Sequence, residues 1–591
     1  MQTGIVDYLI IAVYLLLVVG VGFWFSNRHE NTENYLLGGR NMPYLAVGLS
    51  MMMTLLSSIS IVRIPGEIFN HGWTLFALVV PSLLLQIPAY LLFTRFYFKL
   101  GSFTPYEYLE YRYDVKIRAL IAVSAFYSRG LYLGMVLYTT SKIFEGAYNW
   151  PGWFTILLVG VIGIFYTVLG GMKAVVWTDV IQFFVLAVGL GALVWQLNAL
   201  NDGGIFQTVV YAHRHGHLAP EYATKEFYHF SPYIRLCFWL MLWNALIGPI
   251  TGVSTDQMNV QRILATRDWK SGFKSQIIST LLGASAVVIL YLIGFAIFAY
   301  YTEHPDPFVT KHGGDVALFR FVSTRLPYPF PAIFMAAMLA AIMSTLDSGI
   351  NSLATVYLKE IHQRFFNRGI SDERQVVVSK RATLIVGVFA ISLGMAIDVA
   401  GRWLNQSVTE VGTLFEVLAA CAFPAFLTAV LTKRANSKLI WAFTFFNFGE
   451  AVGKNVWYAL SRSSLLAYHE NTASGFGWAG KLGGGAVCVP LLIGMLLLLP
   501  YVKMTWRQKR WGQMSALTGL FVLGYGNSML LWYIFSNLLI GAEPLARSFA
   551  FFLPSSLLMV FVIVWFCPVQ PESKWRGLTL LTINDSVTVK K

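Results

Sequence analysis

Residues 340–352 read AAIMSTLDSGINS and form the second half of a long apolar segment. At 100° per residue, one stripe of a helix built from this stretch carries Ala341, Ser344, Thr345 and Ser348, with Asp347 beside it. Hydroxyls can bond to carbonyls one turn back, but a carboxylate at membrane depth is costly and indicates function. The stretch therefore predicts a polar site inside an apolar helix.

The composition indicates a membrane protein that crosses the bilayer many times. The chain has 591 residues, of which 56% are hydrophobic and 12% charged, whereas about 25% charged is usual for a soluble globular protein. The first apolar run, 5–25, follows no basic segment and no small-residue cleavage site, so we expect a retained span. The four cysteines lie in apolar segments without paired spacing, which favours buried thiols over a metal or disulfide site.

About fifteen apolar segments are long enough to cross the hydrocarbon layer. The run at 5–25 precedes the core spans, which we expect at 44–70, 72–94, 119–146, 152–169, 174–200, 233–255, 275–301, 329–357, 382–400 and 407–431. Further spans follow near 439–460, 482–500, 514–540 and 549–567. All-α architecture is the predicted fold class.

The distribution of basic residues predicts the orientation of the spans. Most of the 43 Lys and Arg residues fall in loops that lie in the cytosol if the N-terminus is outside and the C-terminus inside. We count the basic residues between the sixth and seventh core spans, from Arg262 to Lys274, among these loop charges. The net charge of +14 is then explained by membrane orientation, and no nucleic-acid partner is needed.

Two core spans contain breaks. The first reads MMMTLLSSISIVRIPGE at 51–67, where hydroxyls and Arg63 precede a Pro-Gly break, and the sixth reads WNALIGPITG at 243–252. Interrupted helices at matching places in two five-span halves favour an inverted-repeat transporter whose ligands bind at the midplane. Simple kinks are the alternative, because Pro and Gly are common in membrane helices.

Several motifs together resemble the sodium/solute symporter family, which includes carriers of glucose, proline, sialic acid, iodide, monocarboxylates and vitamins. The motifs are YLLGGR at 35–40, IPGE at 64–67, GGMKAVVWTDVIQ at 170–182, TDQMNVQR at 255–262, STLDS at 344–348 and KR at 433–434. The run at 170–182 is the most specific of them. The set covers residues 1 to about 500, and the final two spans match nothing diagnostic.

The resemblance implies a LeuT-like core of two inverted five-helix repeats that works by alternating access. The expected organisation is a preliminary span and loop at 1–43, repeats at 44–200 and 233–431, an external loop at 201–232, and additional spans with a short tail at 432–591. It also implies a sodium site. The expected ligands are the carbonyls of Met53, Leu56 and Ala341 with the hydroxyls of Ser344 and Thr345. Neutral oxygens suit a hard cation that must be released again, although both hydroxyls can instead bond within their own helix.

In some members of the family a second cation or proton site uses the Asp of the Trp-Thr-Asp motif. The corresponding residues are Asp179, Ser344 and Ser348, with Asp347 where several relatives have a hydroxyl. Two carboxylates near one site repel unless a cation lies between them or one is protonated. We therefore expect Asp179 and Asp347 to share a sodium ion or a proton. The alternative is that Asp347 faces the cytosolic vestibule or caps a helix.

Two intramembrane arginines are candidates for binding the solute. Arg63 and Arg129 each need a partner, and a carboxylate substrate is one; the internal alternatives are Glu67 and Glu416. Sialic acid carriers of the family use an arginine on the third core span, where Arg129 lies. The glutamate that sugar carriers place early in the second core span is missing, but Glu416 is near their sugar-binding amide. The expected solute-site residues are Ser57, Ser60, Arg63, Arg129, Tyr138, Trp243, Asn244 and Glu416.

The function predicted from these patterns is sodium-coupled symport of a small polar organic solute, either a sugar or a carboxylate. Sodium, the solute and the lipid bilayer are the expected partners, and no protein partner is implied. We expect a plasma membrane location, or the inner membrane in a Gram-negative bacterium. Alternatives are a proton-coupled symporter and a solute sensor on the same fold. An enzyme is disfavoured, because the only histidine cluster, at 213–217, is better explained as a solvated loop.

Overall fold

The computed structural model describes most of the first 404 residues and a short later helix. The described ranges are 5–26, 31–73, 79–148, 150–219, 226–228, 252–367, 369–404 and 422–431, with a few isolated positions. The chain divides into two compact units. Unit 1 comprises Met1–Thr94, Arg129–Phe227 and Ala245–Val408, and unit 2 comprises Arg95–Ser128, Tyr228–Asn244 and Thr409–Lys591.

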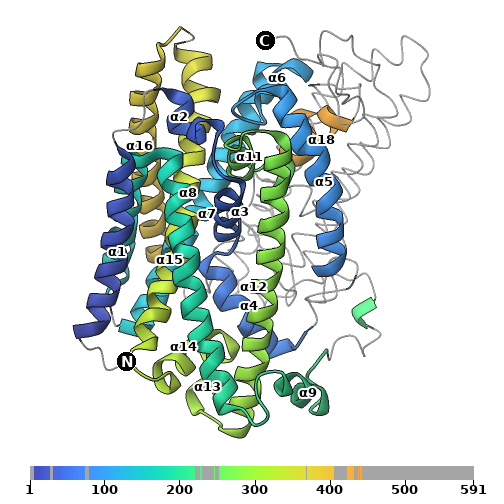
Figure 1. The fold of residues 1–591 in the computed structure, drawn as a ribbon, viewed down its shortest axis with the longest axis vertical. Helices are drawn as coiled ribbons and strands as arrows, with labels where there is room; N and C mark the ends of the chain where they lie inside the picture. The colour runs from blue at the N-terminus through green and yellow to red at the C-terminus, as the bar shows by residue number, and fades with distance from the viewer. Residues whose placement is uncertain are drawn as a thin grey trace, which may run out of the picture. The chain divides into compact units, whose positions relative to one another are not determined.

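The described elements are helices joined by short connections (Figure 1). The longer helices are α1 (Ile5–Ser26), α3 (Tyr44–Leu55), α4 (Ser58–His71), α5 (Val79–Leu100), α7 (Val115–Tyr148), α8 (Gly152–Leu200), α12 (Trp269–Glu303), α14 (Gly314–Arg325), α15 (Phe330–Val356) and α16 (Asp372–Leu404). Shorter ones are α2 (Thr32–Leu37), η1 (Gly38–Arg40), α6 (Glu107–Arg112), α9 (Gln207–Arg214), η4 (Glu226–Tyr228), α11 (Gln257–Leu264), α13 (Pro307–His312), η5 (Tyr357–Phe366) and α18 (Ala422–Leu431).

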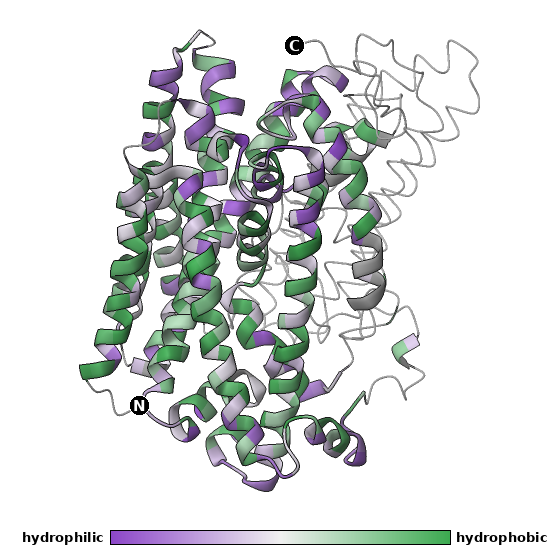
Figure 2. Cartoon of the chain, viewed as in Figure 1, coloured by the Kyte–Doolittle hydropathy of each residue, from purple (hydrophilic) through white to green (hydrophobic). Residues whose placement is uncertain are grey.

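Within the described residues, six helices are long and apolar enough to cross a membrane, or seven if the bent pair α3 and α4 counts as one span. Apolar residues dominate their middles, and polar residues gather towards their ends (Figure 2). The predicted spans at 5–25, 119–146, 275–301, 329–357 and 382–400 each fall within one of these helices. Hydrophobic length thus located these spans, although α16 begins at Asp372, well before the predicted 382.

Helix α8 joins two predicted spans at a kink. Its 49 residues would extend about 73 Å at 1.5 Å per residue, more than twice the hydrocarbon thickness. Gly171 interrupts it with φ 54° and ψ −155°. A Cβ at Gly171 would lie 2.6 Å from the carbonyl oxygen of Tyr35, so glycine is required both by the left-handed φ and by the close approach. The kink falls between the predicted spans 152–169 and 174–200.

The first core span breaks at its hydroxyl cluster. Helix α3 ends at Leu55, α4 begins at Ser58, and the two are bent by 60°. The expected break at Pro65 and Gly66 is wrong, because both residues lie inside α4. A proline removes one backbone donor, and neighbouring groups in a membrane protein can compensate for it. Between Leu56, whose amide makes the last bond of α3, and Ser57, whose carbonyl accepts the first bonds of α4, the helical hydrogen bonds are interrupted.

Helix α15 forms the centre of unit 1. Its apolar window is 94% buried, the highest share among the candidate spans, and it packs against α1, α3, α8 and α16. It runs antiparallel to the second half of α8: a Cβ at Gly189 would lie 2.5 Å from that of Ala337, and Thr178 reaches Asp347. The two helices are thus in a fixed register. A residue in the second half of α8 faces the residue of α15 whose number is about 525 minus its own.

Unit 2 has a small described core. The Tyr113 hydroxyl donates to the Ala425 carbonyl oxygen at 3.0 Å, which joins the end of α6 to α18. Arg112, at the end of α6, is fully buried although it lies between two predicted spans. The predicted spans after 431, most of the sixth span, and Trp243, Asn244 and Glu416 lie outside the described residues.

Candidate ion and solute site

The carbonyl oxygens at the end of α3 lack helical partners. The amide of Leu56 donates to the Met52 carbonyl at 3.0 Å, and Ser57 accepts the first bonds of α4. Within the described chain, no backbone amide takes up the carbonyls of Met53 to Leu56. Because α3 packs against α15, these carbonyls supply oxygens where the sequence predicted a sodium site. We call Met53, Leu56, Ala341, Ser344 and Thr345 the helix-break site.

The two hydroxyls of the helix-break site differ in their bonding. The Thr345 Oγ1 donates to the Ala341 carbonyl at 3.1 Å, which is the intrahelical bond that the alternative interpretation expects. The Ser344 Oγ is fully buried beside the Asp179 carboxylate and forms no well-aligned hydrogen bond among the described residues. A buried hydroxyl without a well-aligned bond is energetically costly. Ser344 is therefore available to a ligand, whereas Thr345 must first give up or share its bond.

A second group of polar side chains lies one helical turn further along α15. It comprises Asp179, Arg262, Ser50, Ser348 and Asp347, and we call it the buried charge cluster. Arg262 Nη2 lies 3.3 Å from Asp179 Oδ2, with the two side chains 1% and 0% exposed. The Ser50 hydroxyl donates to the same oxygen, and Arg262 Nε donates to Ser50 Oγ at 2.8 Å. One carboxylate oxygen of Asp179 thus accepts from both Arg262 and Ser50, and the Ser344 hydroxyl is a further polar neighbour of the same carboxylate.

Asp347 is fully buried and is held by neutral hydroxyls. Tyr166 donates to its Oδ2 at 2.8 Å, Ser348 donates to its Oδ1 at 3.0 Å, and the Thr178 Oγ1 lies 3.5 Å from Oδ2. Arg262 Nη2 also donates to Ser348 Oγ, so this serine connects the two carboxylates. The side chain lies within the protein rather than in an open vestibule. The buried charge cluster contains two carboxyl groups but only one guanidinium. If both carboxyl groups are ionised, one positive charge is missing.

Arg262 is the functional residue that sequence reasoning placed wrongly. It was counted as a cytosolic loop charge, but it lies on α11 with its guanidinium in the buried charge cluster, where it also donates to the Met258 carbonyl at 3.1 Å. The neighbouring Gln261 points elsewhere and donates to the Leu36 carbonyl at 2.7 Å. The TDQMNVQR motif was the signal that could have located Arg262. It is rich in amide side chains and was used to identify the family, but no role was assigned to its arginine.

Arg129 has an internal partner. Its Nη2 lies 2.6 Å from Asp256 Oδ1, and the two side chains are 26% and 20% exposed. Asp256 also caps α11, because its Oδ1 accepts from the Met258 amide at 3.0 Å. Sequence analysis proposed Glu416 as the internal partner and missed Asp256. Ion pairs therefore hold α11 at both ends, through Asp256 and Arg262.

The remaining described solute-site residues come from α4 and α7. The hydroxyls of Ser57 and Ser60 lie 3.5 Å apart, and Arg63 is one turn further along α4 with an exposed side chain. Among described residues Arg63 forms no ion pair, so the expected pairing with Glu67 is absent there. Tyr138 is buried and lies under the Lys142 ammonium.

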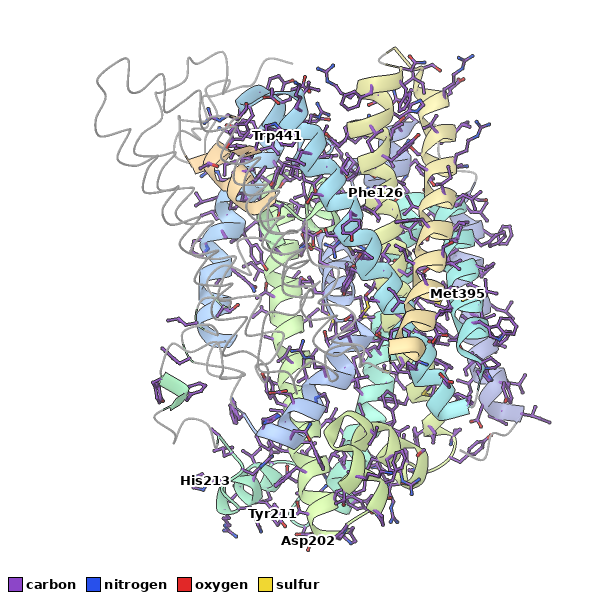
Figure 3. All side chains as sticks on the ribbon, turned by 180° about the vertical axis from the view of Figure 1, so that it is seen from behind. Phe126, Asp202, Tyr211, His213, Met395 and Trp441 are labelled. Atoms are coloured by element: carbon purple, nitrogen blue, oxygen red, sulfur yellow. The ribbon has the colours of Figure 1, made fainter. Side chains whose placement is uncertain are left out.

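The histidines of the loop after α8 do not converge. His215 stacks on Tyr211, whereas His217 stacks on Phe298 and approaches the Ile68 carbonyl at 3.0 Å. Tyr211 and His213 lie on α9 near Asp202, at one end of unit 1 (Figure 3). The described residues contain no group of three His, Cys, Asp or Glu side chains suited to a metal ion.

Comparison with known proteins places the chain in a family. The sodium:solute symporter family matches residues 35–441, a region that includes the helix-break site and the buried charge cluster. The chain belongs to this family, as the motifs indicated, and sodium is its coupling ion.

Individual relatives are moderately similar. The sodium-dependent multivitamin transporter of Oryctolagus cuniculus is 29% identical over 402 residues, which are 66% of this chain and 61% of the transporter. The sodium/sialic acid symporter SiaT of Proteus mirabilis is 26% identical over 451 residues, 73% of this chain and 86% of the symporter. A solved Na+-coupled sialic acid symporter superimposes with a TM-score of 0.68 at 24% identity, covering 83% of this chain and 98% of that one. This last match supports the fold.

Proposed function

We propose that the protein is a sodium-coupled symporter for a small organic carboxylate, working by alternating access. The observation that carries the proposal is the end of α3, whose carbonyls have no helical partners and which packs against α15, the helix that contains the buried Ser344 hydroxyl. A cation satisfies both sets of oxygens at once, which explains why a helix is left open within the bilayer. Met53, Leu56, Ala341, Ser344 and Thr345 are the proposed sodium ligands.

The proposal includes the inverted repeat of two five-helix units within about fifteen spans, with the N-terminus outside and the C-terminus in the cytosol. Basic residues near the span ends support this orientation. The end of unit 1 that carries α2 and α11 is then cytosolic, and the end with α9 and α13 is external (Figure 1). The membrane is the plasma membrane, or the inner membrane in a Gram-negative bacterium.

A carboxylate is favoured over a neutral sugar on two grounds. Arg63 lies on the outer half of the broken helix, one turn from Ser60, with no ion-pair partner in the described chain. A guanidinium binds a carboxylate through two parallel hydrogen bonds. Relatives named for acidic solutes include sialic acid symporters and monocarboxylate transporters. Arg129 is assigned to Asp256 rather than to the solute.

Uptake by proteoliposomes tests the proposal. With sodium outside, vesicles should accumulate a radiolabelled carboxylate, and replacing sodium by choline should abolish uptake. The substrate is found first by screening sugars, sugar acids and small carboxylates for sodium-dependent thermal stabilisation. Ser344→Ala combined with Thr345→Ala should eliminate sodium-dependent uptake, because both hydroxyl ligands are removed. Normal uptake by this double variant would refute the assignment.

A proton at the second site is the competing form of the proposal, motivated by the surplus carboxylate of the buried charge cluster. A solute sensor is separated from both by uptake itself, because a sensor binds solute without accumulating it. Uptake is measured with an inward proton gradient and equal sodium on both sides of the membrane. Accumulation under these conditions indicates the proton-coupled form, and its absence the sodium-coupled one.

A further inference from the structure

Helix α1 lies outside the two expected repeats, yet one stripe of it is buried in unit 1. Its members follow one another at intervals of one helical turn and are Asp7, Ile11, Tyr14, Val18 and Gly22. The helix packs against α8 and α15 at one flank of unit 1 (Figure 1). Its opposite face carries exposed apolar side chains such as Leu16 and Trp24. Packing needs only apolar side chains in the buried stripe, so the Tyr14 hydroxyl requires a separate explanation.

The Tyr14 hydroxyl reaches the contact between α8 and α15. The side chain is buried, and its hydroxyl donates to Met343 Sδ at 3.7 Å and hydrogen-bonds with the Gln182 side chain. A hydroxyl has one donor and two lone pairs, so both bonds can exist at once. The register of α8 and α15 agrees with this arrangement, because it places Gln182 opposite Met343. One side chain of α1 thus bonds to both helices at the same level.

That level is the level of the helix-break site. Met343 directly precedes Ser344, and both are fully buried on α15. Tyr166, on the first half of α8, contacts the same region: its hydroxyl approaches the Met343 carbonyl oxygen at 3.4 Å and donates to Asp347 at 2.8 Å. Gly22 of α1 lies so close to Tyr166 that an added Cβ would be 2.5 Å from the tyrosine Cβ. Helix α1 therefore supports this part of α15 twice, through its own tyrosine and through Tyr166.

We propose that Tyr14 is a positioning residue for sodium binding at the helix-break site. Its hydroxyl fixes the Gln182 amide and the Met343 side chain beside Ser344, and so holds the Ser344 hydroxyl in the orientation that the ion requires. Groups that orient a metal ligand contribute to metal affinity without touching the metal. The preliminary span then takes part in ion binding although it supplies no ligand. The inference rests on the proposed symport and deepens it.

A purely packing role for Tyr14 is the alternative. The ring alone would then fill the space between α1 and α15, and removing the hydroxyl would change stability without changing sodium dependence. Tyr14→Phe separates the two roles, because it keeps the ring and removes only the hydroxyl.

The test measures how sodium-driven uptake by proteoliposomes depends on sodium concentration. In Tyr14→Phe the half-saturating sodium concentration should rise roughly threefold to tenfold, as expected for the loss of one buried hydrogen bond. The KM for the solute at saturating sodium should stay at the wild-type value, because the helix-break site is then filled. Tyr8→Phe is the matched control: Tyr8 lies on the same helix, is 44% exposed, and should leave the sodium dependence unchanged.

A double variant tests the route through the amide. Adding Tyr14→Phe to Gln182→Met should raise the half-saturating sodium concentration no further than Gln182→Met does alone, because the hydroxyl then has no amide to hold. Fully additive effects would overturn the inference. So would a wild-type half-saturating sodium concentration in Tyr14→Phe, whether or not its unfolding temperature has fallen.

Two further outcomes are distinguishable from these. If Tyr14→Phe does not fold, Gln182→Met decides alone: a raised half-saturating sodium concentration supports the inference, and a wild-type value refutes it. Failure of the proposed function looks different, because the wild-type protein would then show no sodium-dependent uptake.

Discussion

The helix-break site and the buried charge cluster are separated by one turn of α15, yet they handle charge differently. The helix-break site offers only neutral oxygens, those of backbone carbonyls and of two buried hydroxyls. The buried charge cluster carries two carboxyl groups and its own guanidinium. A neutral site gains its cation entirely from solution, whereas a charged site must be largely neutralised by the protein itself to be stable inside a membrane. Substitutions in the two sites should therefore fail in different ways.

The largest effect is expected at Asp179. Asp179→Asn leaves the buried guanidinium of Arg262 without its counter-charge, and such a loss costs about 3–5 kcal/mol of stability. The unfolding temperature of the purified protein in detergent should fall sharply, in sodium and in choline alike. Pairing this change with Arg262→Gln removes both charges and should recover most of the loss. Equal instability of the double variant would mean that the ion pair is not what the cluster requires.

Asp347→Asn should change the free energy available for solute accumulation more than it changes the folding stability. The amide retains an acceptor for the Tyr166 hydroxyl, but the charge deficit of the cluster disappears and the second cation is no longer needed. One charge moved through about 100 mV contributes ~2.3 kcal/mol and a tenfold sodium gradient ~1.4 kcal/mol. Losing one coupled ion should thus reduce the maximal accumulation ratio by roughly 400-fold. Reversal potentials give the stoichiometry, and an unchanged ratio and pH profile would reject a shared ion.

In the helix-break site, Thr345→Ala should weaken sodium binding and leave the sodium-free protein nearly as stable as before. The only described bond that is lost runs to the Ala341 carbonyl of the same helix, and such local bonds contribute little net stability. The half-saturating sodium concentration should rise roughly tenfold, as for one lost polar ligand. Thr345→Ser keeps the hydroxyl and serves as the control. Equal sodium affinity in both variants would restrict Thr345 to its intrahelical role.

The smallest effect is expected where α11 meets Arg129. Asp256→Asn removes the ion pair but keeps a side-chain oxygen for the Met258 amide, because Asn caps a helix about as well as Asp. A partly exposed pair contributes about 1 kcal/mol or less, so the unfolding free energy should change by no more than that. A loss of stability as large as that of Asp179→Asn would show that both ends of α11 are equally critical. It would contradict the expected difference between buried and partly exposed ion pairs.

The sequence predicted the parts of the fold that depend on hydrophobic length. Spans such as 329–357 are long, apolar and uninterrupted, and their helices begin and end near the expected residues. The residue pattern placed the break in the first core span at Pro65, whereas the family resemblance implied unbonded carbonyls at Met53 and Leu56, and the chain bends at Leu56. Local propensity identifies where a helix can break, and packing against α15 determines where it does.

The candidate site was predicted only where one helix carries the pattern. The stripe from Ala341 to Ser348 follows from periodicity, since all its members lie on α15. Arg262 could not be found in this way. Counting basic residues near span ends assumes that every one of them is solvated, and nothing in the sequence of α11 indicates that this helix is buried. Tyr166 lies before the kink at Gly171 and Asp179 after it, so their arrangement around Asp347 depends on a backbone angle that periodicity does not reveal.

The close approach of α8 and α15 has a mechanical consequence. Gly189 faces Ala337 and Gly163 faces Leu346 with no room for an added methyl group, so neither helix can slide along the other without a steric clash. In the proposed alternating-access cycle, we therefore expect the two helices to move together as one body. The bend of 60° between α3 and α4 is then the expected hinge, and the sodium ion proposed at the helix-break site would hold the two helices in one relative orientation until it leaves.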